Sequence, residues 1–340
     1  MIEKGASDLH IGVPNQPVLR IHGDLVVQND LPPITKEDAE QLLVQITNRE
    51  QLKIFDAEKE LDFAYSVPGI ARFRVNVLVQ RGTLSIAFRF VPYVIPSIDS
   101  LELPSILKHL VLKQHGLILV TGQTGTGKST TMAAMINHIN EHEKRNIITI
   151  EEPIEFLYQN KKSIIYQCEV GSDTQTFGKA LRHALRHDPD VLVVGEMRDL
   201  VTIATAITAA ETGHLVLGTL HTFNAAQSID RMIDVFPADQ QQQIRFQLSQ
   251  VLEAIISQTL VPRIKGGRVA AFEILIATAA VKNLIREGKV FQIPGVMSMS
   301  TKEGMQTLDQ SLAGLVKKRI VSPEEALLRA NDAEQYQRYL

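Results

Sequence analysis

The chain has 340 residues, 44% of them hydrophobic and 21% charged, which is ordinary for a soluble globular protein with room for two domains. A formal net charge of −3 argues against a general attraction to nucleic acid or anionic lipid. The single cysteine, Cys168, excludes an internal disulfide and a cysteine-based zinc site. No apolar run reaches the roughly 18 residues of a membrane helix, and the N-terminus lacks a signal-peptide core. We therefore expect a cytoplasmic protein that meets a membrane only through a partner.

Proline residues near 92–104 divide the chain into two differently patterned parts. The first part has one predicted helix, over 36–46 with Thr35 as its N-cap, and strand-like segments at 9–11, 17–21, 61–65, 72–80 and 83–90. In the second part helices alternate with short apolar strands at 117–120, 147–150, 191–194, 215–219 and 270–276. Such alternation is typical of a doubly wound, largely parallel α/β sheet. We expect a small α+β domain with its linker over 1–97 and an α/β domain over 98–340.

The end of the chain has its own pattern. From about residue 280 it is predicted to be a helical tail whose breaks are marked by glycines. In the segment 281–287, Val281, Leu284 and Ile285 form an apolar stripe that favours packing within this tail. The alternative is that its other side, with Lys282, Arg286 and Glu287, contacts a partner. The small residues of 292–304 predict a mobile loop.

A glycine-rich turn between a predicted strand and a predicted helix is the most informative segment. It fits the phosphate-loop pattern G-x-x-x-x-G-K-[ST] at every fixed position. Glycines let backbone N–H groups approach a triphosphate closely, and the positive end of the following helix adds to the attraction. Lys128 is expected to reach the β- and γ-phosphates, and the Ser129 hydroxyl to ligate Mg²⁺. The predicted nucleotide-binding residues are Gly122, Gln123, Thr124, Gly125, Thr126, Gly127, Lys128, Ser129 and Thr130.

Acidic residues follow two other predicted strands, on the side where ligands of open α/β sheets bind. Glu196 comes after the apolar strand 191–194, as in a Walker B motif, and is expected to polarise water or hold Mg²⁺, directly or through water. Glu151 and Glu152 come after 147–150 and are placed to orient water opposite the γ-phosphate. The alternative for this pair is a solvated acidic loop.

Two histidines flank another predicted strand. His214 precedes 215–219 and His221 follows it, and one of them is expected to donate a hydrogen bond to the γ-phosphate. A pair of metal ligands is disfavoured, because a strand of this length holds the two side chains far apart. A structural role for both is the alternative.

The order of these segments resembles that of the secretion ATPase superfamily, and within it the type IV pilus retraction ATPases of the PilT/PilU type, or twitching motility proteins. The matching segments are the phosphate loop, TIEEPIE (149–155), RHDPD (186–190), GEMRD (195–199), AAETGH (209–214) and GTLHT (218–222). Two further segments narrow the resemblance to retraction ATPases. These are ASDLH (6–10), near the start of the N-terminal domain, and AVKNLIRE (280–287), similar to a helix that marks this group. The resemblance covers nearly the whole chain.

The resemblance implies a homohexamer whose subunits combine a PAS-like N-terminal domain with a RecA-like ATPase domain and bind ATP and Mg²⁺ between them. It implies catalytic parts for Glu196, Glu151 and His221, with His214 and Glu152 supporting the nucleotide. Hydrolysis of ATP to ADP and phosphate would power pilus retraction through an inner-membrane platform protein, at the cytoplasmic face of that membrane. A paralogous retraction ATPase is a further expected partner, and nucleic acid is not.

Arginines of the N-terminal domain are the remaining candidates. Arg74 and Arg89 lie on adjacent predicted strands and match the family's arginines that reach toward the nucleotide, where an arginine finger stabilises transferring phosphate. Arg72 and Arg81 are weaker candidates. The alternative is that all four are solvated residues on the strand surface.

Two departures from the family stand out. The second acid of TIEEPIE is usually aspartate, so Glu151 takes the catalytic part and Glu152 a supporting one. Relatives also usually have a short helix ahead of the position where this chain starts, which suggests a trimmed or misassigned start.

Other functions stay open at this stage. One is an accessory retraction ATPase. An extension or type II secretion ATPase is disfavoured by the single cysteine, since those proteins usually carry a four-cysteine zinc module. A hexameric nucleic-acid translocase lacks support from charge or clustered aromatics. A GTPase is disfavoured because the segment NKKS (160–163) lacks the final aspartate of N-K-x-D.

Overall fold

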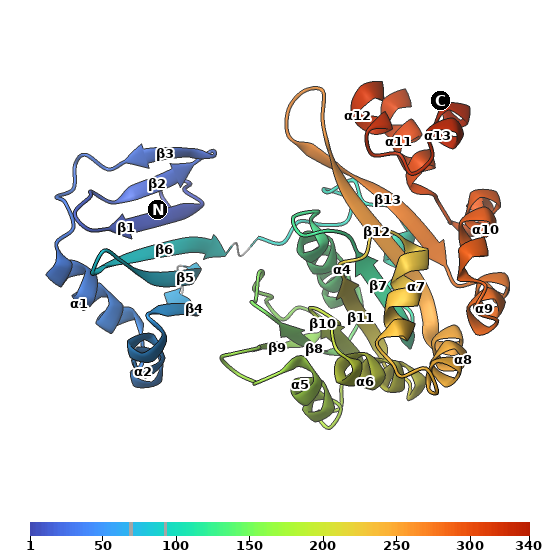
Figure 1. Ribbon diagram of the computed structural model, residues 1–340, viewed down its shortest axis with the longest axis horizontal. Helices are drawn as coiled ribbons and strands as arrows, with labels where there is room; N and C mark the ends of the chain where they lie inside the picture. Colours follow the sequence, from blue (N-terminus) through green and yellow to red (C-terminus); the bar gives the residue numbers. More distant parts are fainter. Residues whose placement is uncertain (68–70, 92–93) are drawn as a thin grey trace. The chain divides into compact units, whose positions relative to one another are not determined.

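The computed structural model describes residues 1–67, 71–91 and 94–340. Pro92 and Tyr93, part of the proline-rich segment expected to separate the domains, lie outside the described residues. By its internal contacts the chain forms two compact units, Met1–Val94 with Glu155–Leu157, and Ile95–Ile154 with Tyr158–Leu340 (Figure 1).

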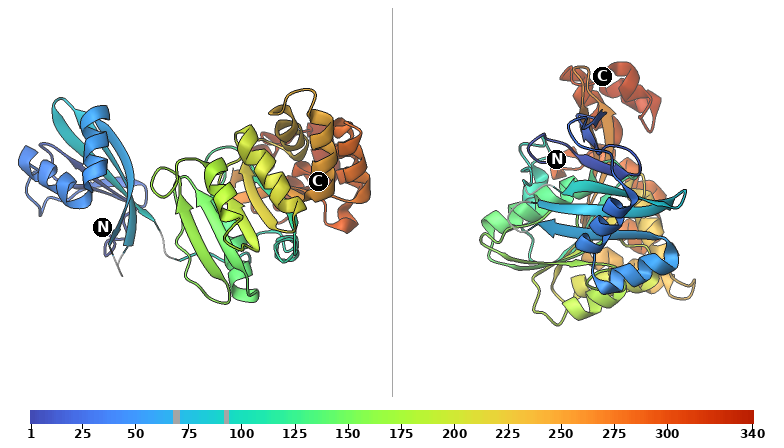
Figure 2. Two further views of the ribbon diagram at one scale, coloured as in Figure 1. Left: turned by 90° about the horizontal axis from the view of Figure 1, so that it is seen from below. Right: turned by 90° about the vertical axis from the view of Figure 1, so that its left-hand side faces the viewer.

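The N-terminal unit is an antiparallel sheet of six strands in the order β3-β2-β1-β6-β5-β4, with two helices (Figure 2). Its elements are β1 (Asp8–Gly12), β2 (Val18–Ile21), β3 (Asp24–Val27), α1 (Lys36–Ile46), α2 (Arg49–Glu58), β4 (Glu60–Val67), β5 (Ala71–Gln80) and β6 (Thr83–Val91). Apolar residues of α1 and α2, among them Leu43 and Phe55, bury against Val75 and Ile86 of the sheet. This PAS-like α+β arrangement confirms the expected fold class.

Local signals account for the first helix. The Thr35 hydroxyl accepts a hydrogen bond from the backbone N–H of Asp38 at 3.1 Å, and the Asp38 carboxylate accepts one from the backbone N–H of Thr35 at 3.0 Å. This reciprocal cap satisfies N–H groups that a helix start leaves unpaired. Helix α1 therefore begins and ends at the predicted residues, whereas α2 and the exposed edge strand β3 were not predicted.

The second unit contains a sheet of seven strands in the order β13-β12-β7-β11-β10-β8-β9, parallel except for β13, which pairs antiparallel with β12. Its elements before the tail are α3 (Ile106–Leu110), β7 (Gly116–Thr121), α4 (Lys128–His142), β8 (Asn146–Glu151), β9 (Ile164–Glu169), α5 (Phe177–Ala184), β10 (Val191–Val194), α6 (Leu200–Glu211), β11 (Leu215–Leu220), α7 (Ala225–Asp234), α8 (Gln241–Val251), β12 (Leu252–Pro262) and β13 (Arg268–Ile276). All five predicted strands of this part are present, and β9 and β12 are additional.

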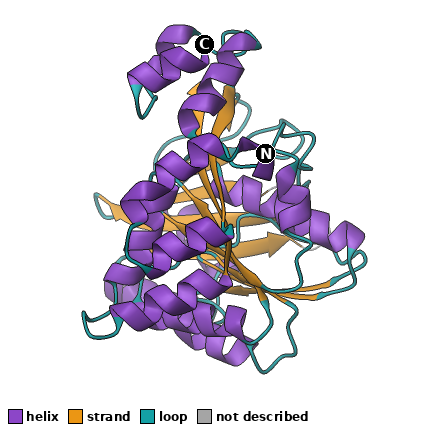
Figure 3. Cartoon of the chain, turned by 90° about the vertical axis from the view of Figure 1, so that its right-hand side faces the viewer, coloured by secondary structure: helices purple, strands orange, loops and turns teal. Residues whose placement is uncertain are grey.

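Helices cover both faces of this sheet (Figure 3). Along β7 the side chains alternate: Leu117 and Leu119 join one buried cluster, and Ile118 and Val120 join another. The second cluster contains the apolar face of α4, formed by Met132, Met135, Ile136 and Ile139. A strand that is apolar on both faces is typical of a parallel sheet enclosed by helices. The unit is RecA-like, as expected.

The tail after β13 is helical in its described residues, which confirms that expectation. It comprises α9 (Ala279–Arg286), η1 (Val290–Gln292), α10 (Ile293–Met299), η2 (Thr301–Glu303), α11 (Leu308–Lys317), α12 (Pro323–Leu327) and α13 (Ala333–Tyr339). The predicted loop over 292–304 is wrong. Ile293 and Met297, one helical turn apart, are buried in the main core and hold α10 against it.

Candidate functional site

The glycine-rich turn links the end of β7 to the start of α4. Its three glycines, Gly122, Gly125 and Gly127, all have positive φ, at 145°, 80° and 88°. A Cβ on Gly122 would lie 2.4 Å from the main-chain oxygen of Gln258, which no real Cβ tolerates. Both the backbone conformation and the close approach of β12 therefore require glycine at this position.

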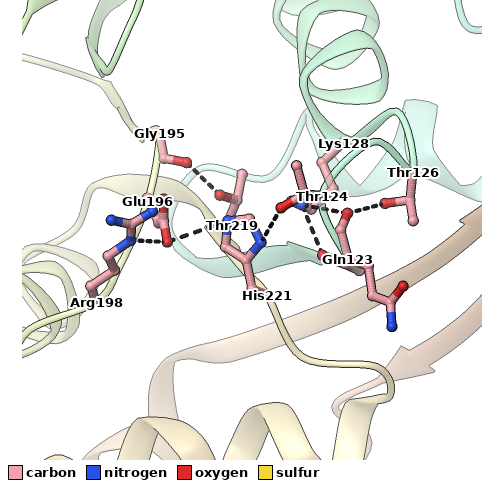
Figure 4. A network of polar contacts seen from close by, with 10 residues as sticks. Gln123, Thr124, Thr126, Lys128, Gly195, Glu196, Arg198, Thr219 and His221 are labelled. Atoms are coloured by element: carbon pink, nitrogen blue, oxygen red, sulfur yellow. Dashed lines mark hydrogen bonds and ion pairs between the residues drawn. The ribbon is translucent and has the colours of Figure 1, made fainter.

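The ammonium group of Lys128 lies inside the curve of this loop (Figure 4). It donates hydrogen bonds to the main-chain oxygens of Gly122 and Gln123, at 2.8 and 2.9 Å. Ser129 and Thr130 follow in the first turn of α4 and are half-buried. A positive charge framed by a turn and a helix N-terminus is an arrangement that attracts phosphate.

Gln258, on β12, braces the loop from behind and was not predicted. Its Nε2 donates to the main-chain oxygen of Thr126 at 2.7 Å, and its Oε1 accepts from the Thr131 hydroxyl at 2.7 Å. In the same region the Thr121 hydroxyl donates to the Ser257 hydroxyl at 2.9 Å. These bonds join the loop to a strand far along the sequence. The spacing of the motifs does not predict these bonds, although the polar pair Ser257 and Gln258 within an otherwise apolar segment could have indicated them.

A polar network connects the loop with the ends of β11 and β10 (Figure 4). His221 Nε2 lies 3.3 Å from Glu196 Oε1, and His221 Nδ1 lies 3.4 Å from the Thr124 hydroxyl. Arg198 Nε donates to the same carboxylate oxygen of Glu196. This hydrogen bond raises the pKa of Arg198. Because β11 lies between β7 and β10, His221 is held between the phosphate loop and the Walker B acid.

Glu151 ends β8, the strand beside β10. Its Oε1 accepts hydrogen bonds from the Thr149 hydroxyl at 2.6 Å and from Gln167 Nε2 at 3.1 Å. The negative charge of Glu152 contributes to the raised pKa of Arg198, after the hydrogen bond that Arg198 donates to Glu196 and the charge of Glu196. The acids predicted to orient water thus lie at the same edge of the sheet as Glu196.

His214 does not join this group within the chain, and its expected part at the nucleotide stays a prediction. Its main-chain oxygen accepts from the N–H of Gly116, at the beginning of β7, whereas the loop follows the end of β7. Its Nδ1 lies 2.9 Å from the main-chain oxygen of Ala209. Parallel pairing of β11 with β7 sets His214 about six residues, or roughly 20 Å, from the loop.

Comparisons with known proteins agree with this geometry. Residues 1–267 match the family model described as type II/IV secretion system protein. The chain belongs to this family. It is 48% identical over 98% of its length to a Pseudomonas aeruginosa protein named type IV pilus retraction ATPase PilT, covering 97% of that protein. It is 42% identical over 98% of its length, and 87% of the relative, to type IV pilus ATPase PilU of the same species.

Among solved structures, one similar to this chain is described as the crystal structure of the pilus retraction motor PilT and bound ADP. The sequences are 46% identical, the TM-score is 0.93, and the match covers 99% of this chain and 96% of the other. With its phosphate loop and these relatives, the chain is an ATPase of the secretion family.

The two arginines of this secretion ATPase that were expected to reach the nucleotide face each other across β5 and β6. Arg89 Nε donates to Asp8 Oδ1 at 2.9 Å, and Arg74 Nε lies 3.9 Å from Asp62 Oδ1. All four line a cavity of about 300 Å³ in the N-terminal unit. Burial raises the pKa of Asp8, but hydrogen bonds from Arg89 and Ser7 outweigh it and bring that pKa below its usual value.

The two residues expected to hold Mg²⁺, Ser129 and Glu196, offer oxygen atoms as ligands. Among the described residues, no cluster of three or more histidine, cysteine, aspartate and glutamate side chains could hold a metal. The Ser129 hydroxyl and the Glu196 carboxylate fit Mg²⁺, which binds few protein oxygens and completes its shell with water and substrate phosphates. Within the described residues, no helix is both long and apolar enough to cross a membrane.

Proposed function

We propose that this chain is a Mg²⁺-dependent motor that hydrolyses ATP to ADP and phosphate and powers type IV pilus retraction and twitching motility. The observation that carries the proposal is the Thr124–His221–Glu196 network at the phosphate loop, in a chain similar over nearly its full length to a retraction ATPase. A loop, an acid and a histidine that share one sheet edge suit phosphoryl transfer, in which positioning and electrostatics do most of the catalysis.

Each residue of the network has a proposed part. The loop Gly122–Thr130 holds the phosphates, and Lys128 neutralises part of their charge. Glu196 and Glu151 position the attacking water, with Glu152 supporting them. His221 would donate a hydrogen bond to the γ-phosphate through Nε2, which now faces Glu196, while Thr124 would hold Nδ1 and with it the orientation of the ring.

Bound Mg²⁺ would neutralise developing charge on the phosphates, and the Ser129 hydroxyl with the Glu196 carboxylate would hold it. Arg74 and Arg89 stay candidates for arginines that approach the nucleotide. Their present partners, Asp62 and Asp8, would have to release them for that role. We propose domain limits of 1–97 and 98–340 for this motor.

The proposed assembly is a homohexamer at the cytoplasmic face of the inner membrane. Its partner there is the pilus platform protein, which supplies the only membrane contact. A release of γ-phosphate contacts at His221 and the loop would change the subunit's conformation, a common switching device in nucleotide-driven proteins. The work of that change would disassemble the pilus.

Deletion of the gene in its host tests the biological role. We expect hyperpiliated cells that do not twitch, restored by the wild-type gene and not by Glu196→Gln. Loss of surface pili would instead indicate an extension motor. With purified protein, His221→Gln should lower ATP turnover by about a hundredfold or more, whereas His214→Gln, at the other end of β11, should not.

An accessory retraction ATPase is the second candidate, favoured by the 42% identity to PilU over the same share of the chain. The two candidates differ under load. A main motor is required for all retraction, whereas an accessory motor is required only when the pilus pulls against resistance. Retraction of single pili in deletion cells, measured with and without an optical-trap load, distinguishes them.

A further inference from the structure

A groove of about 570 Å³ lies between strand β9, at the edge of the large sheet, and helix α5. Its apolar lining comes from the sheet and from one face of the helix. Ile148 and Ile150 of β8 and Ala180 and Ala184 of α5 are all less than 9% exposed. Helix α5 packs on β8 and β10, whereas the side chains of β9 that point to this face remain accessible. Figure 1 shows α5 beside β8 and β9.

Groups that donate hydrogen bonds surround this apolar lining. Lys179, His183 and His187 line the groove together with Tyr166, whose ring lies 6.2 Å from that of His187. Lys179 Nζ donates to the amide oxygen of Gln175 at 3.0 Å and forms no ion pair among the described residues. The rim therefore offers two imidazoles and the positive charge of Lys179, which has no carboxylate partner among the described residues.

The one acid in the lining is already engaged in a turn. Asp173 Oδ2 accepts a hydrogen bond from the backbone N–H of Glu169 at 2.8 Å. The volume falls within the range of small-molecule sites, about 300–1,000 Å³, and the mixture of apolar lining with a few polar groups is typical of them. A ligand with an apolar body and an anionic group would therefore match the apolar lining and the ammonium group of Lys179 together.

We propose that the groove is a binding site for a small anionic amphiphile, with its apolar body against Tyr166 and Cys168 of β9, above the buried Ile148 and Ile150, and its anionic group at Lys179 and His187. The groove shares no lining residue with the phosphate loop. Its occupant would lie over β8, the strand that ends at Glu151, without entering the ATPase site.

Cys168 provides a reporter for this site. It is the only cysteine of the chain, it lines the groove, and it is partly exposed. Burial and, to a smaller extent, the charge of Asp173 raise the pKa of its thiol. Alkylation by N-ethylmaleimide is therefore slow but confined to one position, and an occupant of the groove blocks it.

The test uses the full chain and two dyes with the same rings, the anionic anilinonaphthalene sulfonate and the uncharged N-phenylnaphthylamine. We expect the sulfonate dye at saturation to slow Cys168 alkylation at least about fivefold, with no recovery when ATP is added in excess. Lys179→Glu should weaken binding of the sulfonate dye about tenfold and leave the uncharged dye within about twofold. The matched change Lys318→Glu, on an exposed position after α11, should affect neither dye.

Cys168→Trp places a large ring in the groove and should abolish binding of both dyes. If Cys168→Trp lacks a cooperative thermal transition, Lys179→Glu still tests the proposal, because Lys179 is exposed and its replacement does not disturb the core. Alkylation of Cys168 at the same rate with and without dye would overturn the proposal. So would equal loss of sulfonate binding in Lys179→Glu and Lys318→Glu, because the charge effect would then be general.

Discussion

Replacement of Gln258 by leucine should weaken nucleotide binding without altering any residue of the phosphate-loop motif. The amide group of Gln258 makes two hydrogen bonds of 2.7 Å, a part-buried one to the Thr126 main-chain oxygen and a buried one from the Thr131 hydroxyl. Gln258 is 4% exposed and Thr131 is 1% exposed. Leucine fills a similar volume but removes the hydrogen-bond partner of the half-buried Thr126 main-chain oxygen and of the Thr131 hydroxyl, which water does not reach.

Each buried polar group left unpaired costs about 1–3 kcal/mol, so the free energy of unfolding should fall by about 2–6 kcal/mol in Gln258→Leu. The loop should also lose its fixed shape. If it then holds the binding conformation about a tenth of the time, the apparent affinity for ATP falls about tenfold. Thr131→Val removes only the bond to α4, so it should cost about 1–2 kcal/mol and leave affinity within about twofold.

Denaturant unfolding and titration with a fluorescent ATP analogue measure these effects in the two single variants and the double variant. Because valine and leucine leave no unpaired hydroxyl between them, the double variant should be more stable than the sum of the two losses predicts, by about 1 kcal/mol. Strictly additive losses would refute a direct Gln258–Thr131 bond. Unchanged ATP affinity in an otherwise destabilised Gln258→Leu would refute the bracing of the loop.

Three further predictions concern a glycine and two carboxylates. Gly122→Ala should abolish ATP binding and strongly lower the melting temperature. Gly125 also has positive φ, but no atom lies near an added Cβ, so Gly125→Ala should lower the free energy of unfolding by only about 1–2 kcal/mol. Equal effects of the two variants on the melting temperature would contradict this. Burial raises the pKa of Glu273 above its usual value of 4.5. The side chain therefore stabilises the fold most below pH 4.5, where it is protonated in both states, and this contribution is lost as the pH rises. In denaturant titrations, the stability of Glu273→Gln relative to wild type should increase from pH 4.5 upward. Burial raises the pKa of Asp8, but hydrogen bonds, first of all the one from Arg89, outweigh it and lower that pKa. The free energy of unfolding of Asp8→Asn should therefore be about 1 kcal/mol below that of wild type at neutral pH. A difference that fails to shrink below pH 3.8 would argue against the Asp8–Arg89 pair.

Local patterns predicted many elements well and failed where local signals were missing. Strand β10 and helix α1 have the predicted bounds, because an apolar run or a capping residue marks each of them. Strand β12 was missed because it begins at Leu252, directly after α8 ends at Val251, with no glycine or proline between. Strand β9 was missed because, as an edge strand, it keeps exposed positions and lacks a continuous apolar run.

The sequence by itself determined the chemistry of the phosphate loop, since the glycines, Lys128 and Ser129 act within a few residues of one another. Only the tertiary structure decided which other residues meet that loop. The sheet order inserts β11 between β7 and β10, so it brings His221 to Glu196 and carries His214 away. It also sets Gln258 behind the loop. Which strands pair depends on packing between residues that are far apart in the sequence, so the spacing of residues within a motif does not predict it.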